Sequence, residues 1–476
     1  MKSKYLIRGI IGLIVLYAIG AGIMRQIHIG RLAEQLRAGS QEEKMAAARD
    51  LMKRDRLYDK VQEMKPEERI TAAQAVKSIG GEQAVRQLLG LLKDADANVR
   101  TQVTAALSEI GGEHIAVLIP SLKDSDANVS AGASNALIAI GPKVIPQVQT
   151  AAKDGSLRGP AMNVLIKIGP PSVPAVIDLL DEDDQDLRMA AADALGKIGS
   201  KDATPALLKS TGDIAAVRRV AVSSLCAICD PRSTDLLVEV LSQTRDDGEV
   251  RARAARALSV IGGGRAISAL VGALGDMDQK VRTSVITGIQ RLGDPAVGPV
   301  VAAIAGGSST VRHAGAAALE KIDSTSASAA LLKLSKDSDP VVRISAARGL
   351  GEQRSNPQTS ALISMLSDSD GRVADAAVLS LAGQGSSAVS PLISVISNAG
   401  QAEVVKFRAA TALAKIGADA APSLKQVASS GGPASVWAVF ALGQAGDRSA
   451  RDIIAKLASS SNPEIKWTAE RALQRL

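Results

Sequence analysis

The stretch Leu187-Arg188-Met189-Ala190-Ala191-Ala192-Asp193-Ala194-Leu195-Gly196-Lys197-Ile198-Gly199 is the clearest copy of a pattern that recurs along this chain. If Leu187 is offset zero, then offsets four, eight and eleven are Ala191, Leu195 and Ile198. Residues at this spacing lie on one face of an α-helix and form an apolar stripe. The stretch therefore predicts an amphipathic helix that ends at Gly199, because glycine adopts the left-handed conformation that closes many helices.

The pattern occurs fifteen times between Glu43 and Leu476, with a period of 25 to 33 residues. Offset four is Ala in twelve copies, and offset eight is Leu in thirteen. The positions equivalent to Leu187 are Glu43, Glu68, Val99, Val129, Leu157, Leu187, Val217, Val250, Val281, Val311, Val342, Val373, Val405, Ala434 and Ile465. One copy cannot bury its apolar stripe alone, so neighbouring copies must stack. We therefore expect an all-α fold, a right-handed α-solenoid of about fifteen stacked helix pairs.

The composition agrees with a solenoid and argues against a nucleic-acid groove along it. Hydrophobic residues make up 46% of the 476 residues, but only seven are Phe, Trp or Tyr. The net charge is +7, and residues 1–60 hold twelve Lys and Arg against six Asp and Glu. Because the repeats themselves are close to neutral, the basic excess belongs to the N-terminal end of the chain.

The first 27 residues have the charge pattern of a membrane-targeting segment. Lys2, Lys4 and Arg8 precede a charge-free run over residues 9–24, which Arg25 closes. Its sixteen residues span about 24 Å at about 1.5 Å per residue, short of the roughly 30 Å hydrocarbon core. The flanking arginines can lengthen the span by snorkelling, so we expect an uncleaved single-pass membrane anchor.

Two alternatives stay open for this segment. Small residues such as Ala18 and Gly20 suit a cleaved signal peptide, which would make the chain secreted, and the third possibility is a buried apolar helix. If the short N-terminal tail stays inside, the solenoid lies outside the cytoplasm. The expected organisation is a membrane anchor or signal segment over residues 1–27, a juxtamembrane helix or linker over 28–41, and the repeat solenoid over 42–476.

Each unit also carries a recurring pair of opposite charges. Offset one is Lys or Arg in twelve of fifteen copies, and acids commonly precede it, as Asp337 and Asp339 precede Arg343. An acid at a helix start accepts hydrogen bonds from free backbone N–H groups, and the arginine can reach that acid or the turn carbonyls of a neighbouring unit. A basic stripe for phosphates is one interpretation, and we favour the other, an inter-repeat Asp–Arg ladder. The ladder arginines are Arg100, Arg188, Arg218, Arg251, Arg282, Arg312 and Arg343.

With its Asp-rich turn, Val-Arg pair, Ala at offset four, Leu at offset eight and Ile-Gly ending, the unit resembles HEAT repeats. The short period is most similar to the phycobilisome-lyase-type subtype of these repeats. The resemblance implies the fold and says little of function, because this fold hosts unrelated activities. Glu43 and Glu68 depart from the pattern by replacing the apolar anchor, so we expect a polar cap or an altered register there.

The histidines give no sign of a metal centre. His28, His114 and His313 are the only three, and they lie far apart in sequence. None belongs to a His-Glu pair, the motif through which HEAT-like deoxyhypusine hydroxylases bind iron. We therefore expect no metal, no cofactor and no enzyme activity.

The chain contains one CxxC motif, formed by Cys226 and Cys229. The two cysteines stand at the positions that Gly196 and Gly199 occupy in the clearest copy of the repeat. Small-residue packing at a helix end is the interpretation we favour, and a redox or metal role or a local disulfide is the alternative.

Aromatic side chains gather near the C-terminal end. Residues 59–406 contain no Phe, Trp or Tyr, whereas the last units contain Phe407, Trp437, Phe440 and Trp467. Three of the four project from offsets two and six, opposite the apolar stripe. These rings either cap the end of the stack or form an anchor patch for a protein partner, because aromatics are enriched at binding hot spots.

These observations favour a membrane-tethered, non-catalytic scaffold that binds a protein partner on the solenoid surface. One alternative, implied by the family resemblance, is a lyase-like or chaperone-like accessory subunit of an enzyme system. A nucleic-acid-binding protein is the disfavoured alternative, because the near-neutral repeats lack both the charge for phosphates and the rings for base stacking.

Overall fold

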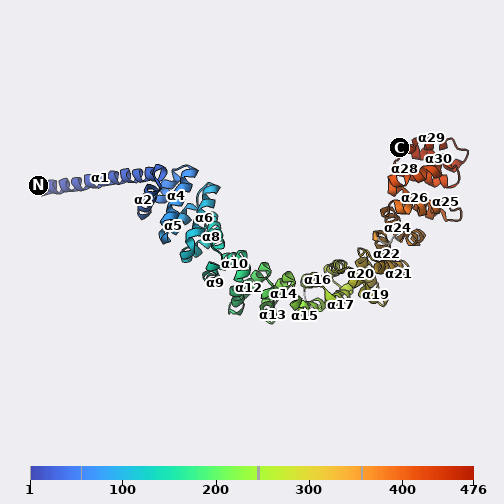
Figure 1. Cartoon of the computed structure of the whole chain (residues 1–476), viewed down its shortest axis with the longest axis horizontal. Coiled ribbons are helices and arrows are strands. Elements are labelled where there is room, and N and C mark those ends of the chain that lie inside the picture. The colour runs from blue at the N-terminus through green and yellow to red at the C-terminus, as the bar shows by residue number, and fades with distance from the viewer. Residues whose placement is uncertain (1, 55, 244–246, 355–357) are drawn as a thin grey trace. The chain divides into compact units, whose positions relative to one another are not determined.

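The computed structural model describes residues 2–54, 56–243, 247–354 and 358–476, with side chains from residue 20 onward. These described residues form thirty α-helices and short 3-10 turns, without a β-strand (Figure 1). The chain divides into two compact units, Met1–Ile228 and Cys229–Leu476, which are described separately. The prediction of an all-α fold is confirmed.

Fifteen helices among the described residues correspond to the fifteen sequence copies, and we call them the second helices. Thirteen have the predicted anchor as their third residue, Leu157 directly precedes the helix of its copy, and Ala434 begins its own. The second helices are α2 (Gln41–Lys53), α4 (Pro66–Ile79), α6 (Ala97–Ile110), α8 (Ala127–Ile140), α10 (Arg158–Ile168), α12 (Gln185–Ile198), α14 (Ala215–Ile228), α16 (Gly248–Ile261), α18 (Gln279–Leu292), α20 (Ser309–Leu319), α22 (Pro340–Glu352), α24 (Gly371–Gly383), α26 (Glu403–Ile416), α28 (Ala434–Ala445) and α30 (Pro463–Leu473).

The remaining short helices, the first helices, lie between them in the chain. They are α3 (Leu57–Gln62), α5 (Gly81–Leu91), α7 (Ile115–Leu118), α9 (Ile145–Ala152), α11 (Val173–Asp178), α13 (Thr204–Ser210), α15 (Thr234–Ser242), α17 (Gly263–Gly272), α19 (Val297–Ala305), α21 (Thr325–Leu334), α23 (Thr359–Met365), α25 (Ser386–Ser397), α27 (Ala421–Ser429) and α29 (Arg451–Leu457). Each packs on the second helix that follows it, as α15 does on α16.

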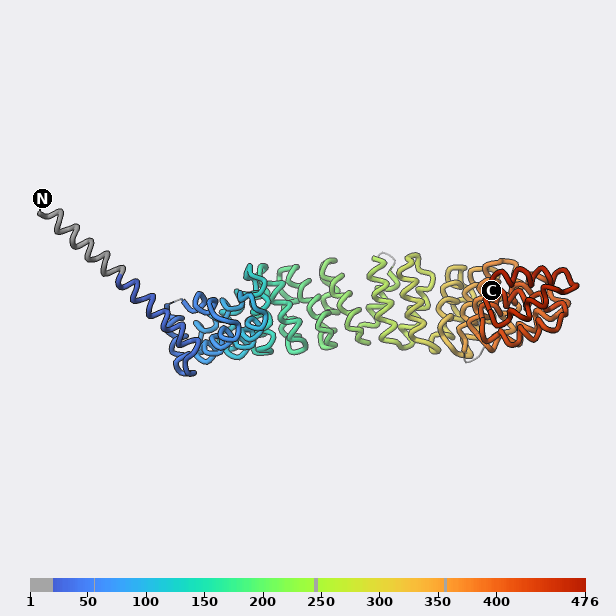
Figure 2. Tube along the Cα trace, turned by 90° about the horizontal axis from the view of Figure 1, so that it is seen from above, coloured from blue at the N-terminus to red at the C-terminus, as the bar shows by residue number. Residues whose placement is uncertain are grey.

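Within each unit, neighbouring second helices contact one another in chain order, for example α12 with α14 and α22 with α24 (Figure 2). The predicted stripe supplies this core, because Ala191 and Leu195 are fully buried. Each buried Leu of this kind contributes about 1.5–3 kcal/mol relative to an exposed one. Alanine at offset four leaves room for the close helix packing that such a stack requires.

Polar side chains fix where the second helices begin. The Asp184 carboxylate accepts hydrogen bonds from the backbone N–H groups of Asp186 and Leu187 at 2.8 and 3.0 Å. In the first two units, Glu43 and Glu68 accept from the backbone N–H groups that precede α2 and α4, at 2.7 and 3.0 Å. A glutamate therefore replaces the apolar anchor there because it caps the helix start, and the register of these units is unchanged.

The helix α1 (Lys2–Ala38) precedes α2 and takes the position that a first helix has in the later repeats. It packs on α2 and α4, and its side chains Ile29, Leu32 and Leu36 are buried. The segment predicted as a juxtamembrane helix or linker is thus largely the end of α1, and it packs against the repeats.

The prediction of a single-pass membrane protein is contradicted. Across the residues that the structure describes, no helix combines the length and the apolar character needed to cross a membrane. In α1, the residues beyond Met24 include Arg25, Arg31 and Arg37, and the buried side chains of this part, from Ile29 to Leu36, pack on protein. Most of the apolar run assigned to the anchor falls on residues 1–19, whose side chains lie outside the described part of the chain.

Candidate functional site

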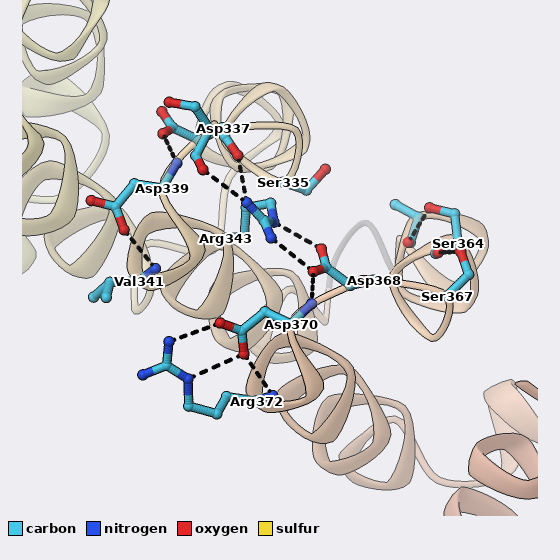
Figure 3. Close-up of polar contacts among 12 residues, drawn as sticks. Ser335, Asp337, Asp339, Val341, Arg343, Ser364, Ser367, Asp368, Asp370 and Arg372 are labelled. Atoms are coloured by element: carbon cyan, nitrogen blue, oxygen red, sulfur yellow. Dashed lines mark hydrogen bonds and ion pairs between the residues drawn. The ribbon is translucent and has the colours of Figure 1, made fainter. Parts of the chain in front are cut away.

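The guanidinium of Arg343 joins two consecutive repeats (Figure 3). Its Nε and Nη2 donate to the two carboxylate oxygens of Asp368 in the next unit, both at 2.8 Å. Its Nη1 donates at 2.9 Å to the backbone carbonyl of Asp337, in the turn before its own helix. Both side chains of the pair are only 13% and 12% exposed. A forked contact of this kind fixes the orientation of both groups as well as their distance.

The same contact recurs at a constant sequence separation of 25 residues. In each case an arginine at offset one forms an ion pair with the aspartate of the following repeat. Both residues of each pair belong to the same one of the two compact units. The pairs are Arg69–Asp94 at 2.7 Å, Arg188–Asp213 at 2.7 Å, Arg251–Asp276 at 2.9 Å, Arg312–Asp337 at 2.8 Å and Arg343–Asp368 at 2.8 Å.

Three of the predicted ladder arginines lack this contact. Arg100 and Arg282 donate only to backbone carbonyls of the turn before their own helix. Among the described residues, neither these two nor Arg218 forms an ion pair. The residue 25 positions further on explains the difference, because it is Ser, Gly or Gln instead of Asp.

The ladder has a clear electrostatic effect. Hydrogen bonds from Arg188 and from the Ile214 backbone N–H hold the pKa of Asp213 below its usual value. The same pairing raises the pKa of Arg188. These groups therefore stay ionised at neutral pH, and the Arg188 guanidinium already donates through Nε, Nη1 and Nη2. A paired arginine of this ladder has little capacity left for phosphate binding.

A different arrangement holds the four predicted aromatic residues. Phe407 lies on α26, Trp437 and Phe440 on α28, and Trp467 on α30, so they come from three consecutive second helices. Phe407 is 46% exposed and Trp467 is 58% exposed, while the other two are half-buried. We call these four residues the C-terminal aromatic surface.

Three of these rings are in contact, Phe407 with Phe440 across two helices and Trp437 with Phe440 within α28. The centroids of Phe407 and Phe440 lie 5.3 Å apart, and Trp437 meets Phe440 edge-on at 6.5 Å. The Trp467 ring instead lies under the guanidinium of Arg471, whose carbon is 4.7 Å from the ring centroid. Both distances between rings are in the range of favourable aromatic pairs, and the cation lies within reach of the π-face.

Trp467 lines two cavities. The first, of about 240 Å³, has Phe440, Arg471 and Arg475 among its other lining residues. The second, of about 480 Å³, is lined also by Trp437, Lys406, Glu403 and Glu464. An apolar side chain placed on this surface would thus have aromatic walls with basic groups on one side and carboxylates on the other.

A scan of protein families decides what kind of repeat forms this ladder and this surface. The model for HEAT repeats matches residues 54–138, 142–215, 211–287, 267–351, 297–382 and 359–436, which together cover well over half of the chain. This chain belongs to the HEAT repeats family. The subtype is not resolved by this match.

Solved structures of other HEAT-type solenoids are similar at low sequence identity. The crystal structure of Kap121p shares 14% identity with a TM-score of 0.47, over 94% of this chain and 56% of that one. Kap95p, from a complex with RanGDP, shares 12% identity with a TM-score of 0.45, over 94% and 72%. Human deoxyhypusine hydroxylase shares 20% identity with a TM-score of 0.24, over 52% and 97%. The chain spans about half the length of Kap121p, and no curated protein sequence matches it.

The other candidate residues are dispersed over the HEAT repeats. His28 lies 3.0 Å from the Asp50 carboxylate, and His114 and His313 lie in distant units of the sequence. In the part of the chain with described side chains, no three His, Cys, Asp or Glu residues are grouped to hold a metal ion.

The cysteines of the CxxC motif take two different roles in the backbone. Cys226 is buried at the end of α14, at the offset where Gly196 stands in α12. Cys229 takes the left-handed conformation of Gly199, with φ of 54° against 74°. Burial raises the pKa of the Cys229 thiol, which disfavours the reactive thiolate.

Sequence reasoning missed Arg471, Arg475 and Glu464 as parts of the surface. Their residue types are common on exposed helix faces, so only their placement beside Trp467 distinguishes them. The helical spacing of four residues between Trp467, Arg471 and Arg475 is the signal that was available, because it puts them on one face.

Proposed function

We propose that this HEAT-repeat protein is a non-catalytic scaffold that binds another protein through its C-terminal aromatic surface. The observation that carries the proposal is the exposure of Phe407 and Trp467, 46% and 58%, in a chain without any other Phe or Trp outside these units. Trp and Arg are enriched at binding hot spots, and the exposed Trp467 lies beside Arg471.

The exposure also bears on the alternative that these rings cap the stack. A cap stabilises the last repeat by burying its large side chains, which removes their apolar surface from water. Trp467 lies on α30, where a cap residue would be expected, yet more than half of its surface is exposed to water. We therefore favour the binding role for Phe407 and Trp467, and a packing role in addition for Trp437 and Phe440.

The charged residues support a role without catalysis. Several carboxylates with lowered pKa values accept hydrogen bonds from ladder arginines or from helix-start N–H groups, as Asp213 and Asp184 do. Such structural pairs shift pKa values without providing a proton donor or acceptor for a substrate.

The test replaces the aromatic side chains by alanine and measures two quantities, the set of proteins labelled nearby in the cell and the melting temperature. The variant Phe407→Ala/Phe440→Ala/Trp467→Ala is compared with Val260→Ala/Met277→Ala/Leu332→Ala, whose side chains are exposed and apolar but lie elsewhere. Proximity labelling in the native cells should lose specific protein neighbours only for the first variant, with a moderate fall in melting temperature because Phe440 also packs in the stack. A large melting loss with an unchanged set of neighbours would show that the rings are a cap.

Two finer assignments stay within this proposal. The short repeat period of 25 to 33 residues supports the phycobilisome-lyase-type subtype. A lyase-like or chaperone-like accessory role is compatible with a protein-binding surface, and the identity of the labelled neighbours would distinguish it from a scaffold.

A further inference from the structure

The two sides of Trp467 carry opposite charge. On one side are the guanidinium groups of Arg471 and Arg475, and on the other is the carboxylate of Glu464. Glu403, which also lines the second cavity, is already paired with Lys406 at 2.9 Å. Within the described residues, Arg471, Arg475 and Glu464 form no ion pair. The three free charges therefore stand on either side of one exposed ring.

The first cavity has the size of a side-chain pocket. Its volume of about 240 Å³ lies below the roughly 300–1,000 Å³ of pockets that enclose small molecules. Gly443 and Ala472 line it between Phe440 and Trp467, and a Cβ added to Gly443 would lie 2.6 Å from the Cβ of Ala472. The small residues thus let α28 and α30 approach closely, and the two rings form its apolar walls.

We propose that this surface binds a peptide segment in which an apolar side chain stands between a carboxylate and a cationic side chain. The apolar side chain enters the cavity between Phe440 and Trp467. The carboxylate pairs with Arg471 and Arg475, and the cation pairs with Glu464. The inference rests on the proposed function, and it adds the chemistry of the partner.

The arginines favour a carboxylate for a geometric reason. A guanidinium presents parallel N–H donors that match the two oxygens of a carboxylate. Stacking on Trp467 leaves the in-plane donors of Arg471 free to make this contact. The same fork is filled by an aspartate in each complete ladder pair, such as Arg343 with Asp368.

Single-stranded nucleic acid is the other ligand class that aromatic and basic side chains can bind. Residues 403–476 hold ten Lys and Arg against six Asp and Glu, so this end of the chain is basic. However, a strand that stacks on Trp467 would bring successive phosphates past Glu464, and like charges repel there. The mixed charge of the surface therefore favours a peptide.

The experiment measures binding of defined peptides to the full chain by fluorescence anisotropy. The probe is a short blocked peptide with a central Phe, Asp residues on one side and Lys residues on the other. Control probes replace Asp by Asn or Phe by Ser, and a fluorescent oligo-dT strand tests the nucleic-acid alternative. We expect saturable binding that weakens up to about fivefold when Asp is replaced by Asn, because an exposed charge pair contributes up to about 1 kcal/mol. Replacing Phe by Ser should weaken binding about tenfold or more, because a buried ring contributes more.

Charge reversal identifies the contacts. Arg471→Glu/Arg475→Glu should weaken the probe about tenfold and should restore binding of a peptide that carries Lys in place of Asp. Lys456→Glu, an exposed basic residue of α29, serves as the matched control and should leave binding unchanged. Equal binding of all peptides, no saturable binding, or displacement of the probe by oligo-dT would overturn the proposal.

The result is separable from that of the proposed function. If Arg471→Glu/Arg475→Glu keeps every neighbour that the aromatic triple variant loses in proximity labelling, the scaffold function stands and the charge assignment fails. If the aromatic triple variant loses no neighbour, the proposed function itself fails.

Discussion

At the scale of single residues, two arginine–aspartate pairs of unit 2 have equal distances and different surroundings. Arg343 and Asp368 are 2.8 Å apart and nearly buried, whereas Arg372 pairs with Asp370 at the same distance while its side chain is 69% exposed. Water screens an exposed pair, and removing one partner of a buried pair leaves an unpaired charge in a dry place. The two pairs should therefore contribute different amounts to the free energy of unfolding of the protein.

The substitution Arg343→Ala is expected to lower the free energy of unfolding by about 2 kcal/mol, because it leaves the Asp368 carboxylate without its cation and the Asp337 carbonyl without its side-chain donor. Arg343→Lys should recover only part of this loss, since an ammonium group lacks the fork. Urea denaturation of these variants beside Arg372→Ala measures the difference. Equal losses for Arg343→Ala and Arg372→Ala would contradict it.

Glu320, at the end of α20, is a half-buried carboxylate whose pKa is raised by burial. Because its pKa is higher in the folded state than in the unfolded state, ionisation at neutral pH weakens the fold, and the loss grows as the pH rises through that pKa. Glu320→Gln should therefore raise the melting temperature at pH 7 and have little effect near pH 4. Glu470→Gln, an exposed residue, is the control, and a pH-independent gain would refute the assignment.

At the scale of helices, packing requires a residue at offset four of α20 that differs from the residue found in most repeats. Twelve copies have Ala at offset four, whereas α20 has Gly315. A Cβ added there would lie 2.3 Å from the Cγ2 of Ile304 on α19. The Ile304 side chain occupies the space that an alanine Cβ at position 315 would need. The two helices α19 and α20 therefore pack more closely here than an alanine would allow.

Gly315→Ala should destabilise the protein by about 2 kcal/mol through overpacking, although alanine is both the consensus residue and the better helix former. Gly298→Ala in α19 has open space around its Cβ position and should stabilise by up to about 1 kcal/mol. Thermal melts of the two variants give the comparison. A stabilised Gly315→Ala variant would show that the two helices separate at little cost.

Asp370 controls the start of α24, where Arg372 lowers its pKa to about 2 through its side chain and its backbone N–H. A carboxylate with a lowered pKa contributes stability above its unfolded value, near pH 4, and the contribution is lost as the pH falls through about 2. Asp370→Asn should therefore differ from the wild type at pH 7 and converge with it in acid. Urea midpoints from pH 2 to 7, with Asp375→Asn as control, test this; a constant difference would count against it.

At the scale of the whole molecule, each repeat contacts its sequence neighbours within its own compact unit, and stability is close to a sum of local terms. The ladder pairs of unit 2, from Arg251–Asp276 to Arg343–Asp368, all lie inside that unit. Unit 2 therefore holds its own core and its own polar contacts.

Residues 229–476 expressed alone should keep a helical circular dichroism spectrum and melt cooperatively. The contrast between Arg343→Ala and Arg372→Ala should persist in this fragment, since both pairs are internal. A fragment with helical signal but no cooperative transition would show that unit 2 requires unit 1 for its packing.

The sequence was sufficient to predict the repeats and their second helices, but it was insufficient to predict the contacts between the repeats. The period gave the position of each second helix, because small and apolar residues at fixed offsets can only be buried by stacking. It could not show that Arg282 has no acidic partner among the described residues while Arg312 has one, because that depends on a single residue of the next repeat. The membrane assignment rested on an apolar run that ends at Met24, whereas the part of α1 that follows carries Arg25, Arg31 and Arg37 and is not apolar enough to extend a span.

The constant separation within the arginine–aspartate pairs has a consequence for how such a chain can change in length. Arg312 and Arg343 occupy equivalent places, and so do Asp337 and Asp368. If residues 313–343 were excised, Arg312 would meet Asp368 in the same geometry, and the new junction would keep its polar contact. The polar contact thus acts as a standard joint that a gain or loss of whole repeats preserves. The apolar packing around it would change, because Ala346 would take the place of Gly315 beside Ile304.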